Sequence, residues 1–163
     1  DNSVRSNLRD GISTGERSTI IGNTVTDNGE NGGDGISASD GSTVTSNTVA
    51  QNHNNGIRLR NGGTVAGNTV SANNIRDSVE RAGITVVYRN AVRGNTVTKN
   101  AQHNIRATGS GNAIDENVIS NSINGIHMPD GGNFYSRNRA SNHTTHFTNP
   151  AVNIDGGDNL APP

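Results

Sequence analysis

The side chains best able to do chemistry in this 163-residue sequence are arginines and histidines that recur in a common frame. A guanidinium group can hold a carboxylate or a sulfate through two parallel hydrogen bonds, and an imidazole can transfer protons near neutral pH. Because the formal net charge of the chain is only -1, a cluster of arginines would stand out as a local cationic strip. The candidates for binding an anionic ligand are Arg58, Arg60, Arg106 and Tyr88. The weaker candidates for acid–base work are His103, His127, Asp77 and Glu80.

The composition restricts which fold could position these groups. Hydrophobic residues make up 28% of the chain and aromatic residues 2%, whereas there are 21 glycines and 27 asparagines. A conventional two-layer domain needs more large apolar side chains to offset its loss of chain entropy. The absence of cysteine excludes disulfide scaffolds and thiol catalysis. No apolar run approaches the roughly 20 residues that span a bilayer, so we expect no membrane insertion, and the near-neutral charge gives no sign of a nucleic-acid partner.

A fixed repeat resolves the apparent shortage of core residues. An apolar residue recurs every 21, 24 or 27 residues, and a valine follows it 13 residues later in most periods. The first column contains Ile12, Ile36, Ile57, Ile84, Ile105, Ile126 and Phe147, and the second contains Val25, Val49, Val70, Val97 and Val118. Each period holds three short segments of strand-like alternation, such as residues 56–59, 64–68 and 69–73. Segments this short are stable only if each pairs in parallel with its equivalent one period later, about 4.8 Å away. The sequence therefore predicts an all-β, single-stranded parallel β-helix of about seven turns with a basic period of 21 residues.

Asparagine forms a further column at a corner of each predicted turn. Stacked amides at such corners can hydrogen-bond to one another and to the turn backbone. The predicted structural ladder consists of Asn7, Asn28, Asn52, Asn73, Asn100, Asn121 and Asn142.

Two periods are longer than 21 residues, and their insertions both enter the strand that carries the isoleucine column. The first lies near residues 29–33 and predicts a flexible, glycine-rich corner. The second occupies residues 74–82, where apolar and charged pairs at i,i+4 predict one or two helical turns, although a plain corner loop fits equally well. Insertions in repeat proteins often border the binding face, so the arginine strip and both insertions point to one surface.

The repeat also divides the chain. We expect a β-helix over residues 1–148, with an incomplete first turn, and an irregular tail or cap over residues 149–163. A β-helix exposes strand edges at its ends, so self-association through uncapped ends is a possible partner interaction.

Repeats such as residues 47–57 and 94–100 resemble the right-handed parallel β-helix repeats of the pectate-lyase-like superfamily. The most similar variety is the carbohydrate-binding and sugar-hydrolase type, which includes mannuronan epimerases and periplasmic copper-maturation proteins. The resemblance covers about residues 2–150 and implies a right-handed coil. The resemblance is specific for the fold but not for a function, because lyases, hydrolases, epimerases, tailspikes and adhesins share the repeat.

The catalytic motifs of the known enzymes of this superfamily are missing from the sequence. Lys99 is the only lysine and lies away from the arginine strip, and the aspartates are scattered singly apart from Asp10 and Asp34, which stack in the frame. No calcium cluster is evident, and the spacing of His143 and His146 is too loose to predict a metal site, so we expect neither metal nor cofactor. An enzyme of this kind would be a polysaccharide lyase, a glycoside hydrolase or a uronate epimerase.

Three functions remain open. The first is recognition or processing of an extended, acidic polysaccharide on one face of the coil, and the second is a non-catalytic shaft of an adhesin or a phage tail fibre. A minor third is ice binding through the Thr-X-Thr units at residues 24–26, 43–45 and 96–98. All three predict a location outside the cytoplasm: extracellular, at the cell surface, periplasmic or on a virion.

Overall fold

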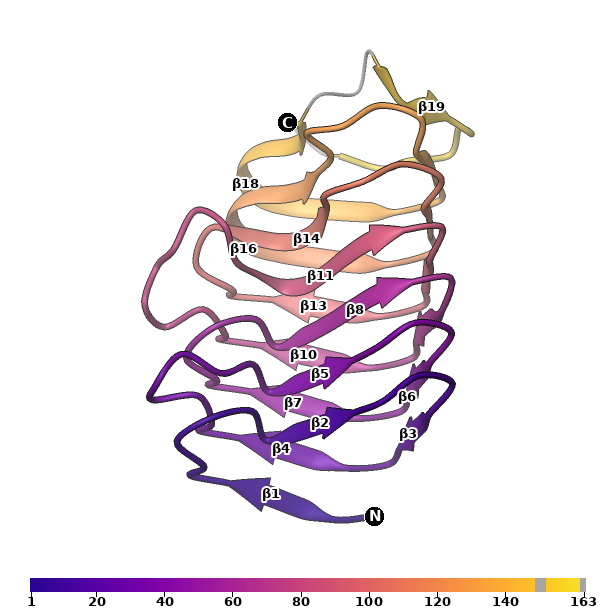
Figure 1. Ribbon diagram of the computed structural model, residues 1–163. Helices are drawn as coiled ribbons and strands as arrows, with labels where there is room; N and C mark the ends of the chain where they lie inside the picture. Colours follow the sequence, from indigo (N-terminus) through magenta and orange to yellow (C-terminus); the bar gives the residue numbers. More distant parts are fainter. Residues whose placement is uncertain (149–151, 162–163) are drawn as a thin grey trace.

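The structure, a computed structural model, describes residues 1–148 and 152–161 and is a parallel β-helix (Figure 1). The chain coils through about seven turns, each built from three short strands joined by corners. Every strand pairing given for these residues is parallel, and the pairing connects each strand to its equivalent one turn away. The predicted fold class, number of turns and three-strand period are confirmed.

The first of the three faces carries the isoleucine column, and we call it the isoleucine face. Its strands are β2 (Ile12–Thr14), β5 (Ile36–Ala38), β8 (Ile57–Asn61), β11 (Ala82–Tyr88), β14 (His103–Ala107) and the second halves of β16 (Val118–His127) and β18 (Arg139–Thr148). The pairing aligns Ile12, Ile36, Ile57, Ile84, Ile105, Ile126 and Phe147 in one column. This face is turned toward the viewer in Figure 1.

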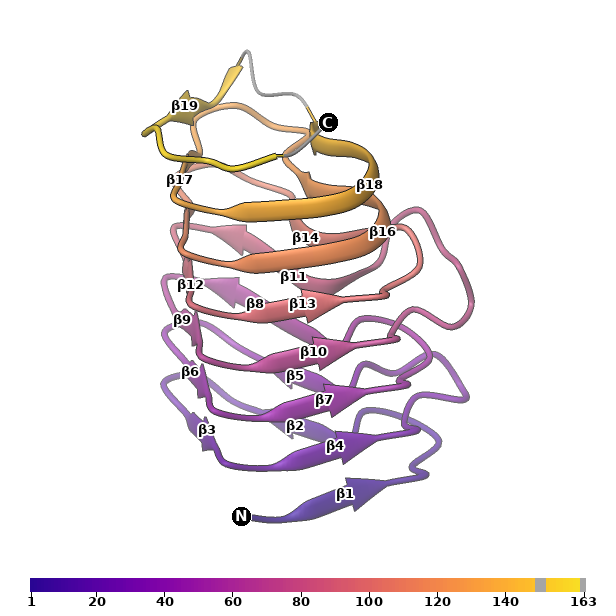
Figure 2. The ribbon, with the colours of Figure 1, turned by 180° about the vertical axis from the view of Figure 1, so that it is seen from behind.

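The other two faces close the coil, and the third is seen in Figure 2. The second face contains β3 (Thr19–Ile21), β6 (Thr43–Thr45), β9 (Thr64–Ala66), β12 (Ala91–Arg93), β15 (Ala113–Asp115), β17 (Phe134–Ser136) and β19 (Ile154–Asp155). The third face contains β1 (Ser3–Arg5), β4 (Thr24–Thr26), β7 (Thr48–Ala50), β10 (Thr69–Ser71), β13 (Thr96–Thr98) and the first halves of β16 and β18.

The core is a narrow column of small aliphatic side chains inside the coil. One or two inward residues per strand are enough to fill it, which explains how 28% hydrophobic residues suffice. The predicted valine column shifts by one residue at its end. Val97 pairs with Ile119, which is buried, while Val118 is 49% exposed and faces outward. The prediction for Val118 is therefore wrong, because side-chain direction in a strand alternates with every residue.

Buried asparagines satisfy the backbone at the corner between the third face and the isoleucine face. Each amide of this ladder accepts a hydrogen bond from the backbone N–H of the asparagine one turn earlier, at 2.9–3.1 Å. The ladder runs through Asn7, Asn28, Asn52, Asn73 and Asn100 and ends where Asn100 donates to Oδ1 of Asn104 at 2.9 Å.

Asn121 and Asn142 do not continue this ladder, contrary to the prediction. Strands β16 and β18 run through the corner without a break, so both side chains are exposed to solvent. The two residues adopt left-handed backbone angles (φ +57° and +56°), which asparagine tolerates well.

A second asparagine ladder, which the sequence analysis did not identify, lies at the corner between the second and third faces. It joins Asn2, Asn23, Asn47, Asn68, Asn95, Asn117, Asn138 and Asn159. A third begins at the remaining corner and joins Asn90, Asn112, Asn133 and Asn153. The coil thus has an amide column at each corner.

The second insertion is the plain corner loop, one of the two predicted alternatives, and not the helical turns. Asn74 and Asp77 have left-handed backbone angles (φ +61° and +53°) that interrupt a helix. The Asn74 side chain holds the loop by accepting from the Ser78 N–H at 3.0 Å and donating to the Ser78 carbonyl at 2.9 Å. Ile75 and Val79, the apolar pair that suggested a helix, are 54% and 63% exposed.

The last described residues lie against the final turn. β19 pairs with β17, and Leu160 forms an isolated bridge with Arg139. The predicted boundary at residue 149 falls on residues 149–151, which lie outside the described residues. In the parts of the chain that the structure describes, no helix is long and apolar enough to cross a membrane.

We expect the replacement Asn52→Ala to destabilise the fold by about 3 kcal/mol or more, because several buried groups lose their partners. The fully buried Asn52 amide accepts from Asn28 and donates to Asn73 and to the Ala50 carbonyl. Urea unfolding followed by circular dichroism measures the change. Asn121→Ala is the matched control. Its side chain is exposed, so the expected loss of stability is only the roughly 1 kcal/mol that alanine costs in a left-handed backbone. Equal losses in the two variants would contradict the ladder's role.

Candidate functional site

In-register pairing sets two polar columns side by side on the isoleucine face. The outward position after the isoleucine column holds Ser13, Ser37, Arg58, Thr85, Arg106, His127 and Thr148. The position two residues before it holds Asp10, Asp34, Asn55, Ala82, His103, Asn124 and Thr145. The first column lies on the strands themselves, and the second lies at the corner where the insertions enter.

A polar pocket of about 350 Å³ opens at this corner in the N-terminal half of the coil. It is lined by Arg9, Asp10, Asn31, Gly32, Gly33, Asp34, Ser37, Asn54, Arg58 and Arg81. Both insertions contribute walls, because residues 31–33 belong to the first and Arg81 to the second. The insertions also meet directly, since the Arg76 guanidinium donates to the Glu30 carbonyl.

Asp34 is the buried acid of this pocket, with a relative exposure of 5%. Its Oδ1 accepts from the Asn55 side chain at 2.8 Å and from the Asn55 backbone at 3.1 Å. Its own backbone N–H donates to Oδ1 of Asp10, one turn earlier, at 2.6 Å. Burial raises the pKa of the Asp34 carboxyl above its ordinary value, and the nearby Asp10 carboxylate raises it further, against the opposing effects of Asn55 and Arg58.

Three arginines line the same pocket: Arg9, Arg58 and Arg81. None of these guanidinium groups forms an ion pair or a side-chain hydrogen bond with another described residue. Arg58 and Arg60 project outward from β8 and alternate with the buried Ile57 and Leu59. The pocket therefore combines a buried carboxyl group with cationic groups that are available to a ligand.

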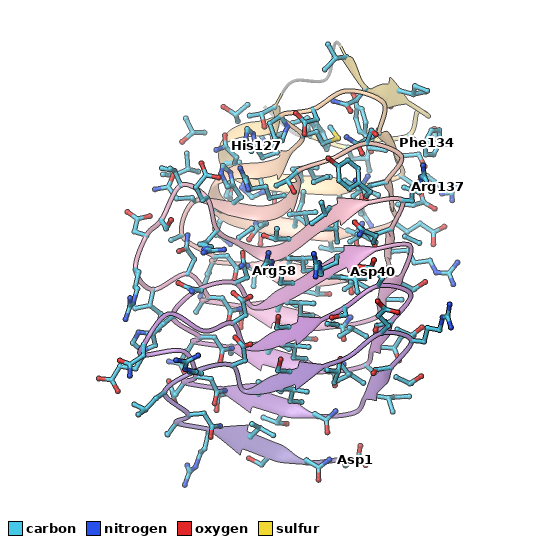
Figure 3. All side chains as sticks on the ribbon, in the orientation of Figure 1. Asp1, Asp40, Arg58, His127, Phe134 and Arg137 are labelled. Atoms are coloured by element: carbon cyan, nitrogen blue, oxygen red, sulfur yellow. The ribbon has the colours of Figure 1, made fainter. Side chains whose placement is uncertain are left out.

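A second cluster lies further along the face, where the stacked imidazoles of His103 and His127 have centroids 4.5 Å apart (Figure 3, which labels His127). His103 Nε2 lies 3.0 Å from the Val79 carbonyl oxygen, which can only accept, so this nitrogen carries the proton. Its Nδ1 accepts from Nδ2 of Asn124 at 3.1 Å. His127 Nδ1 lies 2.6 Å from the Thr148 hydroxyl.

Both imidazoles are held neutral. Burial, together with the charges of the adjacent His127 and Arg106, lowers the pKa of His103 to about 4. Burial and the Arg106 charge also lower the pKa of His127, although Glu80 opposes the shift. Because His103 is bound at both ring nitrogens, it fastens the second insertion to the face and is poorly placed to exchange protons with a ligand.

The remaining predicted site residues are divided between this cluster and other surfaces. Arg106 donates to Glu80 at 2.7 Å and to the Glu80 carbonyl at 3.3 Å, so its charge is already paired. Asp77 accepts from the Gln102 side chain at 2.7 Å. Tyr88 lies in a different pocket, at the other end of the strands. The predicted arginine strip is thus interrupted: among the described residues Arg58 and Arg60 have no ion-pair partner, whereas Arg106 is paired with Glu80.

The predicted site residues did not include Arg9, Asp10, Asp34 or Arg81. The available signal was the stacking of Asp10 and Asp34 in the repeat frame, two residues before the isoleucine column. The approach of Arg81 could not be seen, because it depends on the path of the second insertion.

Other candidate chemistries have less geometric support. Within residues 1–148 and 152–161, no group of three histidine, aspartate or glutamate side chains is placed to share a metal ion. His143 and His146 form an edge-to-face pair with ring centroids 5.6 Å apart. The Thr-X-Thr units lie on two faces, with β4 and β13 on the third face and β6 on the second.

Comparisons with known proteins agree with the architecture. Residues 10–160 match a family model described as a right-handed β-helix region, which confirms the predicted repeat type and hand. Curated protein sequences give no significant match. Among solved structures, the A-module of a mannuronan C-5 epimerase from Azotobacter vinelandii is similar with a TM-score of 0.56 and 14% identity. The likeness covers 94% of this chain but 57% of that one, so the chain spans little more than half of the module, and at this identity the likeness is one of fold.

Acidification should destabilise the protein through His103. Its folded-state pKa of about 4 lies below the ordinary value of 6.5, so the stability contributed by the neutral ring is complete above pH 6.5 and is lost as the pH falls toward 4. The loss amounts to about 3 kcal/mol. Urea unfolding at pH 7.5, 5.5 and 4 measures it. His127 and His143 shift in the same direction, so His103→Gln, whose amide does not titrate, isolates the His103 share by flattening the slope. An unchanged slope in that variant would show that His103 is not responsible.

Proposed function

This chain belongs to the right-handed β-helix family, and we propose that its isoleucine face binds an extended acidic polysaccharide, with one uronate residue seated in the pocket around Asp34 and Arg58. The observation that carries the proposal is the combination, in one polar pocket, of three unpaired arginines and a buried carboxyl group. Such a pocket suits a ligand that offers both a carboxylate and hydroxyl groups.

The arginines account for the acidic part of the ligand. A uronate carboxylate can accept two parallel hydrogen bonds from one guanidinium group, and Arg58 presents its group from the rigid strand β8. Arg9 and Arg81 reach the pocket from the corners before β2 and β11. The arginines would attract a bound carboxylate and the carboxylates of Asp10 and Asp34 would repel it, so it would lie on the arginine side of the pocket.

The other lining groups suit the hydroxyls of a sugar. Ser37 contributes a hydroxyl from β5, and Asn54 contributes an amide that also donates to the Gly32 carbonyl of the first insertion. The pocket lies at one corner of the isoleucine face, where both insertions line it, and the strands beside it offer a surface along which a polymer could extend.

Processing of the polymer is the extended form of this proposal, and Asp34 is the group that supports it. Removal of the proton beside a uronate carboxylate needs a base near the carbon and a cation at the carboxylate. Asp34, whose pKa is raised by burial, and Arg58, which lines the same pocket, supply these two requirements. A hydrolase would instead use Asp34 and Asp10 as its pair of carboxyl groups.

The non-catalytic shaft remains the alternative proposal, supported by the three-ladder coil itself, and a location outside the cytoplasm is part of both proposals. A shaft needs no free arginines in a pocket, so the two proposals differ in what happens when those charges are removed.

Replacing Arg58 should weaken binding to acidic polysaccharide at least tenfold, because the charged donor facing the uronate is lost. Affinity electrophoresis of the Arg58→Gln variant in gels containing pectate or alginate measures the effect, at low and moderate salt. Arg93→Gln is the matched control, since Arg93 is an exposed strand arginine on the second face. Absence of binding by the folded wild-type protein across uronate and sulfated polymers would favour the shaft.

Replacing Asp34 should separate binding from processing. Asp34→Asn keeps an oxygen for the Asn55 bonds, so affinity should stay within about threefold while any chemical change of the polymer slows about a hundredfold. Proton NMR of the polymer after incubation follows cleavage, elimination and epimerisation together. A polymer left unchanged by the wild-type protein would restrict the function to binding.

A further inference from the structure

A second pocket lies at the opposite end of the same strands. It encloses about 560 Å³ and is lined by Asp40, Asn61, Tyr88, Arg89 and Ser110. These residues stand at or beyond the carboxyl ends of β5, β8, β11 and β14, whereas the pocket around Asp34 stands mainly at the amino ends of β2, β5, β8 and β11. Asn61 and Tyr88 are direct partners in the pairing of β8 with β11. Figure 3 labels Arg58 and Asp40 on this face.

Tyr88 presents an aromatic ring to this pocket. The side chain is 49% exposed, and its back packs against the backbone of Gly109, where an added Cβ would lie 2.4 Å from the Tyr88 Cε1 atom. Only a glycine one turn later leaves room for the ring in this position. A tyrosine supported from behind and open in front is a flat surface suited to the apolar face of a sugar ring.

The polar wall of the pocket combines the acceptor groups of Asp40 and Asn61 with Arg89 and Ser110. Asn61 Nδ2 donates to both carboxylate oxygens of Asp40 at 3.1 Å, which fixes the orientation of the two side chains. The Oδ1 atom of Asn61 is buried and has no partner among the described residues. Carboxylate and amide oxygens pair with O–H donors, and sugar hydroxyls are such donors.

We propose that this pocket is a second sugar subsite, in which a pyranose ring stacks on Tyr88 and donates hydroxyl hydrogen bonds to Asp40 and Asn61. The inference rests on the proposed polysaccharide function and adds the direction in which the glycan runs over the isoleucine face. Asn61 is the last residue of β8, about 10 Å beyond Arg58 at the rise of a strand. Arg58 and Arg60 project outward from the strand, whereas Asn61 has the opposite direction in the alternation and stands at the corner where the strand ends. The two subsites therefore place the glycan along the strands, across the coil.

The experiment uses isothermal titration calorimetry to compare the affinity for a uronate monosaccharide with the affinity for a tetrasaccharide of the same uronate. Tyr88→Ala should weaken tetrasaccharide binding about tenfold and leave monosaccharide binding unchanged, whereas Arg58→Gln should weaken both. Gly109→Ala should reproduce the Tyr88→Ala effect by displacing the ring. The matched control is Phe134→Ala, which removes an aromatic residue of 40% exposure from the second face and should change neither affinity.

A spectroscopic readout reports on the ring itself. The chain has no tryptophan and two tyrosines, and Tyr135 is 4% exposed, so a near-ultraviolet difference spectrum on adding tetrasaccharide reports mainly on Tyr88. Wild-type binding without a tyrosine signal, or an unchanged affinity in the folded Tyr88→Ala variant, would overturn the subsite and leave the proposed function standing. Failure of the wild-type protein to bind either sugar would overturn the proposed function as well.

Discussion

Buried corner amides are the interaction on which the rest of this structure depends. The backbone N–H and C=O groups at the corners of this narrow coil are buried and need hydrogen-bond partners. Each corner must therefore bond to the next corner along the axis. Asparagine does this with one short side chain, accepting from the turn before and donating to the turn after. The ladders thereby fix the register of every strand, and register determines which side chains share a column. Both insertions begin directly after ladder residues, Asn28 and Asn73, so the loops vary in length while the coil stays in phase.

The columns were predictable from the sequence because a parallel coil turns spacing along the chain into position in space. The isoleucine column, the number of turns and the polar positions beside Arg58 follow from counting. Counting fails where a strand runs through a corner, as at Asn121, because residue type alone does not say whether the chain bends there. It also fails in the second insertion. The apolar spacing favoured a helix, but the Asn74 side chain hydrogen-bonds to the N–H and carbonyl of Ser78 and holds the backbone in a loop.

The site was only partly predictable for a related reason. Arg58 and Arg106 occupy equivalent positions in the repeat, and the sequence offers no ground for treating them differently. The structure separates them because the second insertion bends toward the face between them. It carries Glu80 to Arg106 and Arg81 to the pocket around Asp34. One loop therefore pairs the charge of Arg106 and adds a second positive charge beside Arg58. The burial that raises the pKa of Asp34 arises at the same crowded corner.

The stacking of identical corners gives the molecule a discrete geometry. Along the axis, two groups on the isoleucine face are separated by whole turns, so their distances come in steps of about 4.8 Å and cannot be tuned more finely by substitution. Along a strand, separations follow the alternation of side chains and change in steps of two residues. A lineage that needed a different ligand spacing would have to gain or lose an entire period, or reshape a loop. Gain and loss of complete turns leaves every remaining corner amide with a partner, so divergence among such coils is expected to proceed by duplication and deletion of periods more readily than by gradual drift of the face.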